Sequence, residues 1–155
     1  PFVLLLCTMA AWRRDWKEAA AWAALVLAFA AGLAWHVAQI HPQVLPSDPQ
    51  GPGWLALRGL SGWLANVVLS SNLRLLPHEL AGPLVVGALL GWSGWRSPAG
   101  STGSLLYGGY ALAFMLVGRS NNYYWGAVIA PAFFTGLAFA PRACISLLRA
   151  ARGPT

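Results

Sequence analysis

The sequence predicts an all-α protein, a polytopic bundle of transmembrane helices. Of its 155 residues, 57% are hydrophobic and only 9% are charged, and the mean hydropathy is +0.56. A soluble domain of ordinary composition carries about 25% charged residues. Ten basic and four acidic side chains cannot cover a globule of this size with a hydrated surface. The composition therefore excludes a soluble enzyme, a disordered tail and a nucleic-acid-binding domain.

Five apolar stretches define the expected spans. A helix needs about 20 apolar residues to cross a hydrocarbon layer of about 30 Å. The expected set is one truncated span at residues 1–12 and four further spans at residues 18–40, 80–95, 103–118 and 123–141. No Met precedes the first run and its basic residues come after it, unlike a signal peptide. We therefore expect residues 1–155 to be a single membrane region, the C-terminal part of a longer polytopic protein.

Basic residues set the expected orientation, because Lys and Arg are enriched in the cytoplasmic loops of membrane proteins. Alternation of the spans leaves three arginines outside: Arg58, Arg74 and Arg119. It leaves seven basic residues inside: Arg13, Arg14, Lys17, Arg96, Arg142, Arg149 and Arg152. The pattern predicts a multi-pass protein of the bacterial cytoplasmic membrane, with an outer segment at residues 41–79 and a cytoplasmic tail after residue 142.

The outer segment divides into a loop and an apolar stretch. Four prolines and two glycines stand among residues 41–53 and stop any helix there. Residues 54–70 are apolar but are interrupted by Arg58 and two glycines. They predict an interfacial helix with Trp54 and Trp63 at the level of the lipid headgroups. A true span is the alternative, and it would turn the C-terminal arginines outward against the charge rule.

Small residues predict close packing between helices. Gly87 and Gly91 form a GxxxG motif, which favours packing within one chain over the alternative of dimerisation. The oligomeric state stays open. Cys7 and Cys144 lie far apart in apolar surroundings, so neither a disulfide nor a metal is assigned to them.

The strongest polar cluster follows the fourth predicted span, in a tight outer hairpin. Its members are Arg119, Asn121, Asn122, Tyr123 and Tyr124. One interpretation is a polar turn with a belt of interfacial aromatic residues. The other is a site for an anionic headgroup, in which the Arg119 guanidinium offers paired donors to a phosphate while amides and hydroxyls complete the contacts.

Other ionisable residues give weaker indications of a functional site. Asp48 and Arg58 are possible contributors from the outer segment, although Asp48, His41 and Glu79 are typical of solvated loops. His36, inside the second span, is typical of a packing residue. No metal site and no cofactor are expected, while a requirement for a divalent metal stays open.

Several motifs together resemble a known class of enzyme. They are Ser47-Asp48-Pro49, Gly51-Pro52-Gly53-Trp54, the hairpin from Gly118 to Trp125, Ala130-Pro131 and Pro141-Arg142. This pattern resembles the C-terminal half of bacterial polytopic GT-C glycosyltransferases, which include mannosyltransferase-like and aminoarabinose-transferase-like membrane proteins. The resemblance covers about the last hundred residues.

The resemblance implies a role for the hairpin. Arg119 would hold the phosphate of a polyprenyl-linked sugar, and Tyr123 or Tyr124 would line the pocket. The commoner form of the motif has a lysine where this chain has Arg119, which keeps the charge and changes its geometry. The catalytic acid of such enzymes lies on an earlier outer loop, so the catalytic residues of this chain stay unknown.

Two functions are therefore considered. The first is the membrane region of a glycosyltransferase that uses a polyprenyl-phosphate sugar donor at the outer face of the membrane. Its partners would be membrane lipids and that donor, with no nucleic acid. The alternative is a non-catalytic integral membrane subunit or half of a transporter, in which Arg119 serves topology or lipid anchoring.

Overall fold

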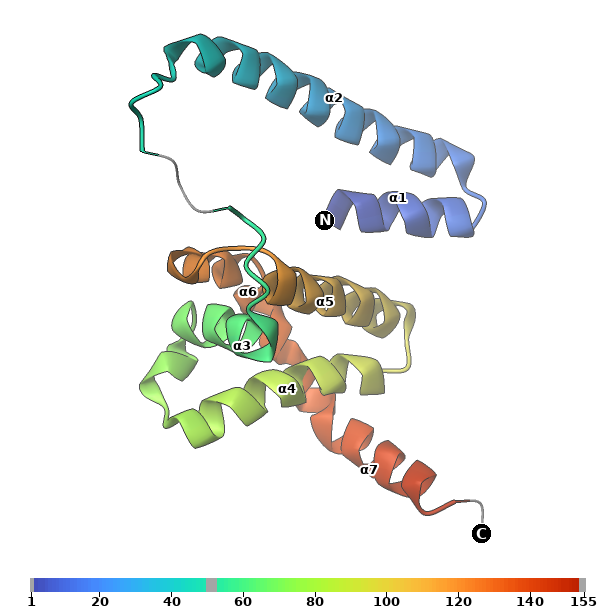
Figure 1. Cartoon of the computed structure of the whole chain (residues 1–155). Coiled ribbons are helices and arrows are strands. Elements are labelled where there is room, and N and C mark those ends of the chain that lie inside the picture. The colour runs from blue at the N-terminus through green and yellow to red at the C-terminus, as the bar shows by residue number, and fades with distance from the viewer. Residues whose placement is uncertain (1, 50–52, 154–155) are drawn as a thin grey trace. The chain divides into compact units, whose positions relative to one another are not determined.

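The computed structural model describes residues 2–49 and 53–153. Every regular element in these ranges is helical, which confirms the all-α prediction, and one isolated antiparallel bridge joins Leu55 to Val117. The α-helices (Figure 1) are α1 (Phe2–Trp12), α2 (Trp16–Ile40), α3 (Gly59–Leu69), α4 (His78–Gly94), α5 (Pro98–Leu116), α6 (Ala130–Phe133) and α7 (Ala140–Ala151). Segments of 3-10 helix are η1 (His41–Gln43), η2 (Asn72–Leu75), η3 (Ser120–Val128) and η4 (Phe134–Phe139).

The chain divides into two compact units, unit 1 (Pro1–Pro52) and unit 2 (Gly53–Thr155). The single membrane region 1–155 stays a prediction. Unit 1 is a hairpin of α1 and α2, and Asp15 caps the second helix by accepting a hydrogen bond from the Glu18 N–H at 3.0 Å. Arg13 forms an ion pair with Glu18 across the turn at 2.8 Å.

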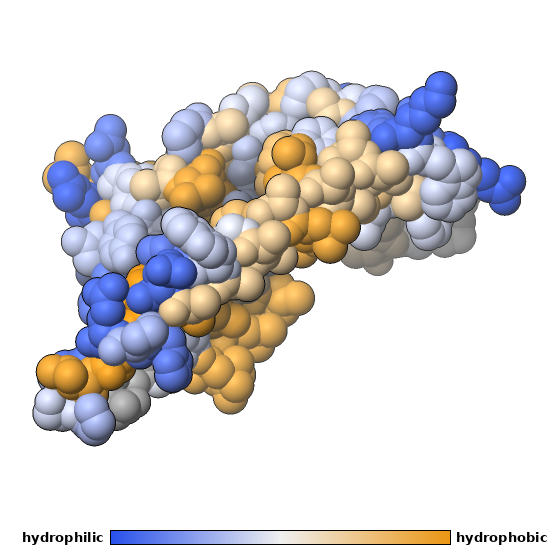
Figure 2. Space-filling view, turned by 90° about the horizontal axis from the view of Figure 1, so that it is seen from above, coloured by the Kyte–Doolittle hydropathy of each residue, from blue (hydrophilic) through white to orange (hydrophobic). Residues whose placement is uncertain are grey.

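Most of α2 is exposed apolar surface. Ala19 is its buried residue, while Phe29 and Trp35 are 71% and 68% exposed. In Figure 2, tan and orange residues form a hydrophobic band on the face in view. An apolar helix that leaves such side chains uncovered is suited to a lipid environment.

Two helical stretches in the described ranges are long and apolar enough to cross a membrane, judged by length and composition: Trp16–Gln43 and Ala130–Ala151. The first matches the span predicted at residues 18–40. The count of one truncated and four further spans stays a prediction. Helices also form at α4 and α5, where two more spans are predicted.

The apolar helical stretch at the C-terminal end differs from the span predicted at residues 123–141, whose place in a membrane stays a prediction. Residues 120–128 form the 3-10 segment η3, and Asn122 has φ −90° and ψ 22°, outside the helical range. Proline fits the first turn of a helix but not its interior, and Pro131 stands in the first turn of α6. The apolar stretch therefore starts at Ala130 and includes Arg142, which the sequence had suggested as the start of a tail.

The core of unit 2 lies where α3, α4, α5 and the C-terminal segments meet (Figure 1). Its largest fully buried apolar side chains are Phe133, Val67 and Val85. The side chain of Trp92, on α4, donates a hydrogen bond from Nε1 to the Phe133 carbonyl at 2.8 Å. The Tyr107 ring packs against Trp92 and Phe133, at centroid distances of 5.1 and 5.2 Å. Aromatic contacts at these distances stabilise a core beyond the area they bury.

The GxxxG motif packs within the chain, as the sequence predicts. A Cβ added at Gly91 would collide with the Gly136 carbonyl oxygen, and one added at Gly136 would collide with the Ala88 carbonyl oxygen. A Cβ at Gly87 would lie 3.6 Å from Leu137. Because no side chain separates them, α4 and η4 cross with their backbones in contact.

The apolar stretch 54–70 is not one helix. Residues 54–57 are non-helical and α3 begins at Gly59, because Leu57 (φ +46°) and Gly59 (φ +60°) both adopt left-handed backbone conformations that interrupt a helix. Trp63 is only 3% exposed and belongs to the core of unit 2. Trp63 therefore does not face lipid headgroups, whereas Trp54 is exposed; the depth of both residues in a membrane stays a prediction.

Candidate functional site: an arginine–amide cluster

The candidate site forms where residues 54–57 pair with the chain leaving α5. The Gly118 N–H donates a hydrogen bond to the Trp54 carbonyl at 2.7 Å, and the N–H groups of Ala56 and Leu57 both donate to the Leu116 carbonyl. Gly118 has φ +106°, a conformation that glycine adopts without strain. This pairing brings two arginines together that are 61 positions apart in the sequence.

Arg58 connects α3 to the chain that follows α5. Its Nη1 donates one hydrogen bond to Asn66 Oδ1 at 2.9 Å and another to the Arg119 backbone carbonyl at 3.2 Å. Arg58 caps the start of α3 and its side chain folds back along the helix over Gly62, where an added Cβ would collide with the Arg58 Cβ. Glycine at position 62 therefore allows the guanidinium to reach Asn66.

Arg119 lies over an aromatic pair. Its Cζ is 4.9 Å from the centre of the Trp54 ring, and that ring stacks on Trp125 at 5.4 Å with an interplanar angle of 10°. A guanidinium above an indole face is attracted by the ring quadrupole. The contact orients the Arg119 side chain while leaving hydrogen-bond donors of its guanidinium available.

Four buried N–H donors have no hydrogen-bond acceptor among the described residues: Trp63 Nε1, Asn66 Nδ2, Arg119 Nε and Asn122 Nδ2. Buried polar groups are nearly always paired, and an unpaired one costs roughly 1–3 kcal/mol. The amide of Asn66 cannot be turned to remove its unpaired nitrogen, because its oxygen already accepts from a guanidinium, which only donates. Asn66 is completely buried and Asn122 is 6% exposed.

The charge of the site is uncompensated in the described part of the chain. The ion pair found there joins Arg13 to Glu18, and neither Arg58 nor Arg119 has a carboxylate partner within residues 53–153. Glu79, at the start of α4, is the one acidic residue in the sequence after residue 52. We call Arg58, Asn66, Arg119 and Asn122 the arginine–amide cluster. With two positive charges and unpaired donors, it is suited to an anionic ligand rich in oxygen acceptors.

The two tyrosines of the predicted site line a pocket to which the cluster residues do not contribute. A pocket of about 280 Å³ is lined by side chains of α3, η2 and η3, among them Ser70, Ser71, Asn72, Arg74, Tyr123 and Tyr124. Tyr123 and Tyr124 are 43% and 58% exposed. Tyr123, which lines this pocket, directly follows Asn122 of the cluster in the sequence.

The remaining predicted residues are not brought into the cluster. Asn121 is exposed on η3. Asp48 belongs to unit 1, where its Oδ2 accepts a hydrogen bond from the Leu45 N–H at 2.8 Å and closes a turn. Gly51 and Pro52 of the quoted motif lie outside the described residues. In residues 2–49 and 53–153, no group of three His, Cys, Asp or Glu side chains is arranged to hold a metal ion.

Sequence reasoning missed Asn66. The signal available was Asn66 itself, the one amide side chain in the apolar run from Leu60 to Leu69. A buried amide in such a helix needs a partner, and that partner, Arg58, stands eight positions earlier.

No protein-family model, curated protein or solved structure matches this chain. The likeness to GT-C glycosyltransferases therefore rests on the motifs quoted above.

Proposed function

We propose that this chain is the membrane region of a glycosyltransferase that uses a polyprenyl-phosphate sugar donor at the outer face of a bacterial cytoplasmic membrane. The arginine–amide cluster holds the phosphate of the donor. Sugar transfer as the reaction is supported by the motif resemblance alone, whereas binding of an anionic group is supported by geometry.

The observation that carries the proposal is the set of unpaired donors. Arg119 Nε and the Nδ2 groups of Asn66 and Asn122 are buried without acceptors in the described ranges, beside two arginines that have no carboxylate there. A phosphate supplies several acceptor oxygens and a negative charge, so it satisfies the donors and the charge together. No neutral alcohol does both.

The tyrosine pocket supports the sugar part of the proposal. It combines aromatic rings with hydroxyl, amide and guanidinium groups from Ser71, Asn72 and Arg74. A few polar groups around an apolar wall are typical of small-molecule sites. Tyr123 of the pocket directly follows Asn122 of the cluster in the sequence, which suits a ligand that carries a sugar next to a phosphate.

Binding to the purified chain tests the proposal. The chain is reconstituted in nanodiscs of zwitterionic lipid and titrated with a short polyprenyl phosphate or with the corresponding polyprenol. We expect the phosphate to bind at least about tenfold more tightly, as one charge-assisted hydrogen bond lost costs about 1.5 kcal/mol or more. Equal affinity for the two compounds would reject the phosphate site.

A structural role is the second candidate, consistent with a non-catalytic subunit or a transporter half. It is favoured by the contacts that both arginines already make, namely Arg58 with Asn66 and Arg119 with Trp54. In that case Arg119→Ala lowers the stability of the chain and leaves its affinity for the polyprenyl phosphate unchanged. The glycosyltransferase proposal requires the affinity to fall.

A further inference from the structure

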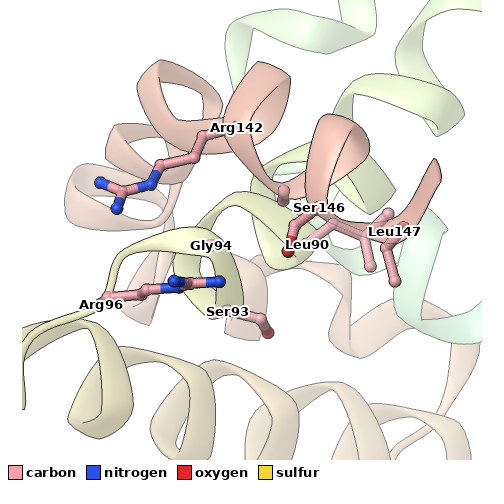
Figure 3. Close-up of a pocket in the computed structure, with 8 residues that line it drawn as sticks. Leu90, Ser93, Gly94, Arg96, Arg142, Ser146 and Leu147 are labelled. Carbon is pink, nitrogen blue, oxygen red and sulfur yellow. The ribbon is translucent and has the colours of Figure 1, made fainter. Parts of the chain in front are cut away.

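A second basic site lies at the other end of α5 from the arginine–amide cluster. A pocket of about 230 Å³ opens between the end of α4 and the start of α7, lined by Leu90, Ser93, Arg96, Arg142, Ser146 and Leu147. Figure 3 shows Arg142 on α7 and Arg96, just after α4, on opposite sides of the pocket. Gly94 and Ala143 bring the two helices into contact beside it, since a Cβ at Gly94 would lie 2.8 Å from the Ala143 Cβ.

The pocket carries two positive charges and hydroxyl groups. Arg96 and Arg142 have no carboxylate partner among the residues that the structure describes. Glu79 stands at the opposite end of α4, a helix of 17 residues and therefore about 25 Å long. Ser93 and Ser146 add hydroxyl donors to the guanidinium donors of the two arginines. This donor set suits a phosphate group.

The apolar surface beside the pocket distinguishes a lipid from a free anion. Leu147 of the pocket wall is 57% exposed, and Ile145 and Leu148 on the same helix are 50% and 59% exposed. Arg142, Ser146 and Arg149 follow at intervals of four and three residues and share the opposite, polar face of α7. A helix with a basic face and an uncovered apolar face is typical of the boundary between headgroups and acyl chains.

The position along the fold is consistent with that boundary. Arg96 precedes α5 and Arg119 follows it, and this helix has 19 residues, which gives a length of about 28 Å. The hydrocarbon layer of a bilayer is about 30 Å thick. The two basic sites therefore stand at opposite ends of a helix that is about one hydrocarbon thickness long.

We propose that this pocket binds an anionic glycerophospholipid. Arg96 and Arg142 hold the headgroup phosphate from two sides, Ser146 donates a hydrogen bond to it, and an acyl chain lies along Leu90 and Leu147. This site is separate from the arginine–amide cluster and does not depend on the chain being a glycosyltransferase.

Lipid retention by the full chain tests the proposal. The chain is purified in a nonionic detergent, offered phosphatidylglycerol or phosphatidylcholine, and examined by native mass spectrometry. We expect about a tenfold preference for the anionic lipid. The variant Arg96→Gln/Arg142→Gln should lose this preference, whereas the matched control Arg149→Gln/Arg152→Gln, with the same change in net charge, should keep it.

A third variant blocks the pocket without changing any charge. Ser146→Leu replaces one hydroxyl on the polar face of α7 by a larger apolar side chain that fills the pocket, and it should also abolish the preference. Size-exclusion profiles and melting temperatures show whether each variant is folded. The preference of the unchanged chain for the anionic lipid is measured independently of any variant. Equal losses in the two double variants, or retained preference in Ser146→Leu, would overturn the site. Displacement of the lipid by millimolar inorganic phosphate would overturn the lipid assignment in favour of a free anion.

Discussion

Arg58 donates a hydrogen bond from its guanidinium to the backbone carbonyl of Arg119, across 3.2 Å and 61 positions of sequence. The Arg58 side chain is thereby held against the backbone of a second arginine, and neither residue has a carboxylate partner in the described ranges. The interaction fixes the backbone of Arg119 but uses none of the donors of the Arg119 side chain. The first arginine positions the second, and the second remains available for a ligand.

Removing the Arg119 side chain should weaken phosphate binding. We expect Arg119→Ala to lower the affinity for a polyprenyl phosphate by roughly ten- to a hundredfold, because one charge-assisted partner contributes about 1.5–3 kcal/mol. Arg119→Lys should retain part of the affinity, since an ammonium keeps the charge but loses the paired donors. Titration of nanodisc-embedded protein measures both effects, with Arg152→Ala, just after α7, as the control for net charge. Unchanged affinity in Arg119→Ala would exclude a phosphate contact.

Asn66 allows binding to be separated from folding. Asn66→Asp removes a buried unpaired donor and sets a carboxylate opposite Arg58, so the pair keeps its hydrogen bond. We expect a folded protein with at least about tenfold weaker binding of the anionic ligand, because the new charge neutralises Arg58. Melting curves and ligand titrations on the same preparation measure the two quantities. Binding as tight as in the unchanged chain would show that the cluster does not contact the anion.

The contact between α4 and η4 should tolerate no side chain. Gly91→Ala directs a methyl group into the Gly136 carbonyl, and we expect a loss of about 1–3 kcal/mol in stability from overpacking. Gly108→Ala is the matched control on α5, where an added Cβ has nothing within 4 Å. That change should be neutral or stabilise by up to about 1 kcal/mol. Thermal denaturation in detergent compares the two, and equal effects would contradict the close crossing.

Topology gives a prediction that does not depend on any ligand. In a chain with both native cysteines replaced by alanine, a cysteine at Ser47 should react with an impermeant thiol reagent in intact cells. A cysteine at Ala150, near the end of α7, should react only after permeabilisation. Both residues are exposed, so burial in the protein does not explain a lack of reaction. The reverse labelling pattern would overturn the orientation expected from the basic residues.

Composition and helical pattern were sufficient to predict the fold class, the helix at residues 18–40 and the glycine contact at Gly91. Arg58, Arg119 and Asn122 were also candidates from sequence, as polar residues in an apolar chain. Their association was not predictable, because it depends on the pairing of Leu55 with Val117 across most of unit 2. Local patterns carry no information on such long-range contacts.

The differences between prediction and structure at Trp63, Leu57 and Asn66 also arise from information that the local sequence does not contain. Trp63 is amphipathic and therefore suits both an interface and a core with equal ease, and only packing shows that it is buried. The break before α3 depends on the left-handed conformation of Leu57, which leucine rarely adopts. Asn66 was overlooked because one amide in an apolar helix attracts attention only once its partner is known.

The arginine–amide cluster consists of two arginines and two asparagines and contains no carboxylate, imidazole, thiol or phenol. Guanidinium, carboxamide and indole groups keep the same charge at every pH that a cell normally meets. Any pH dependence of binding there must come from the ligand. A phosphate monoester gains its second negative charge near pH 6, whereas a phosphodiester does not. The pH dependence of binding affinity would therefore identify the ligand. Affinity that rises between about pH 5 and 7 indicates a phosphate monoester. A flat profile indicates the diester of a sugar-loaded lipid.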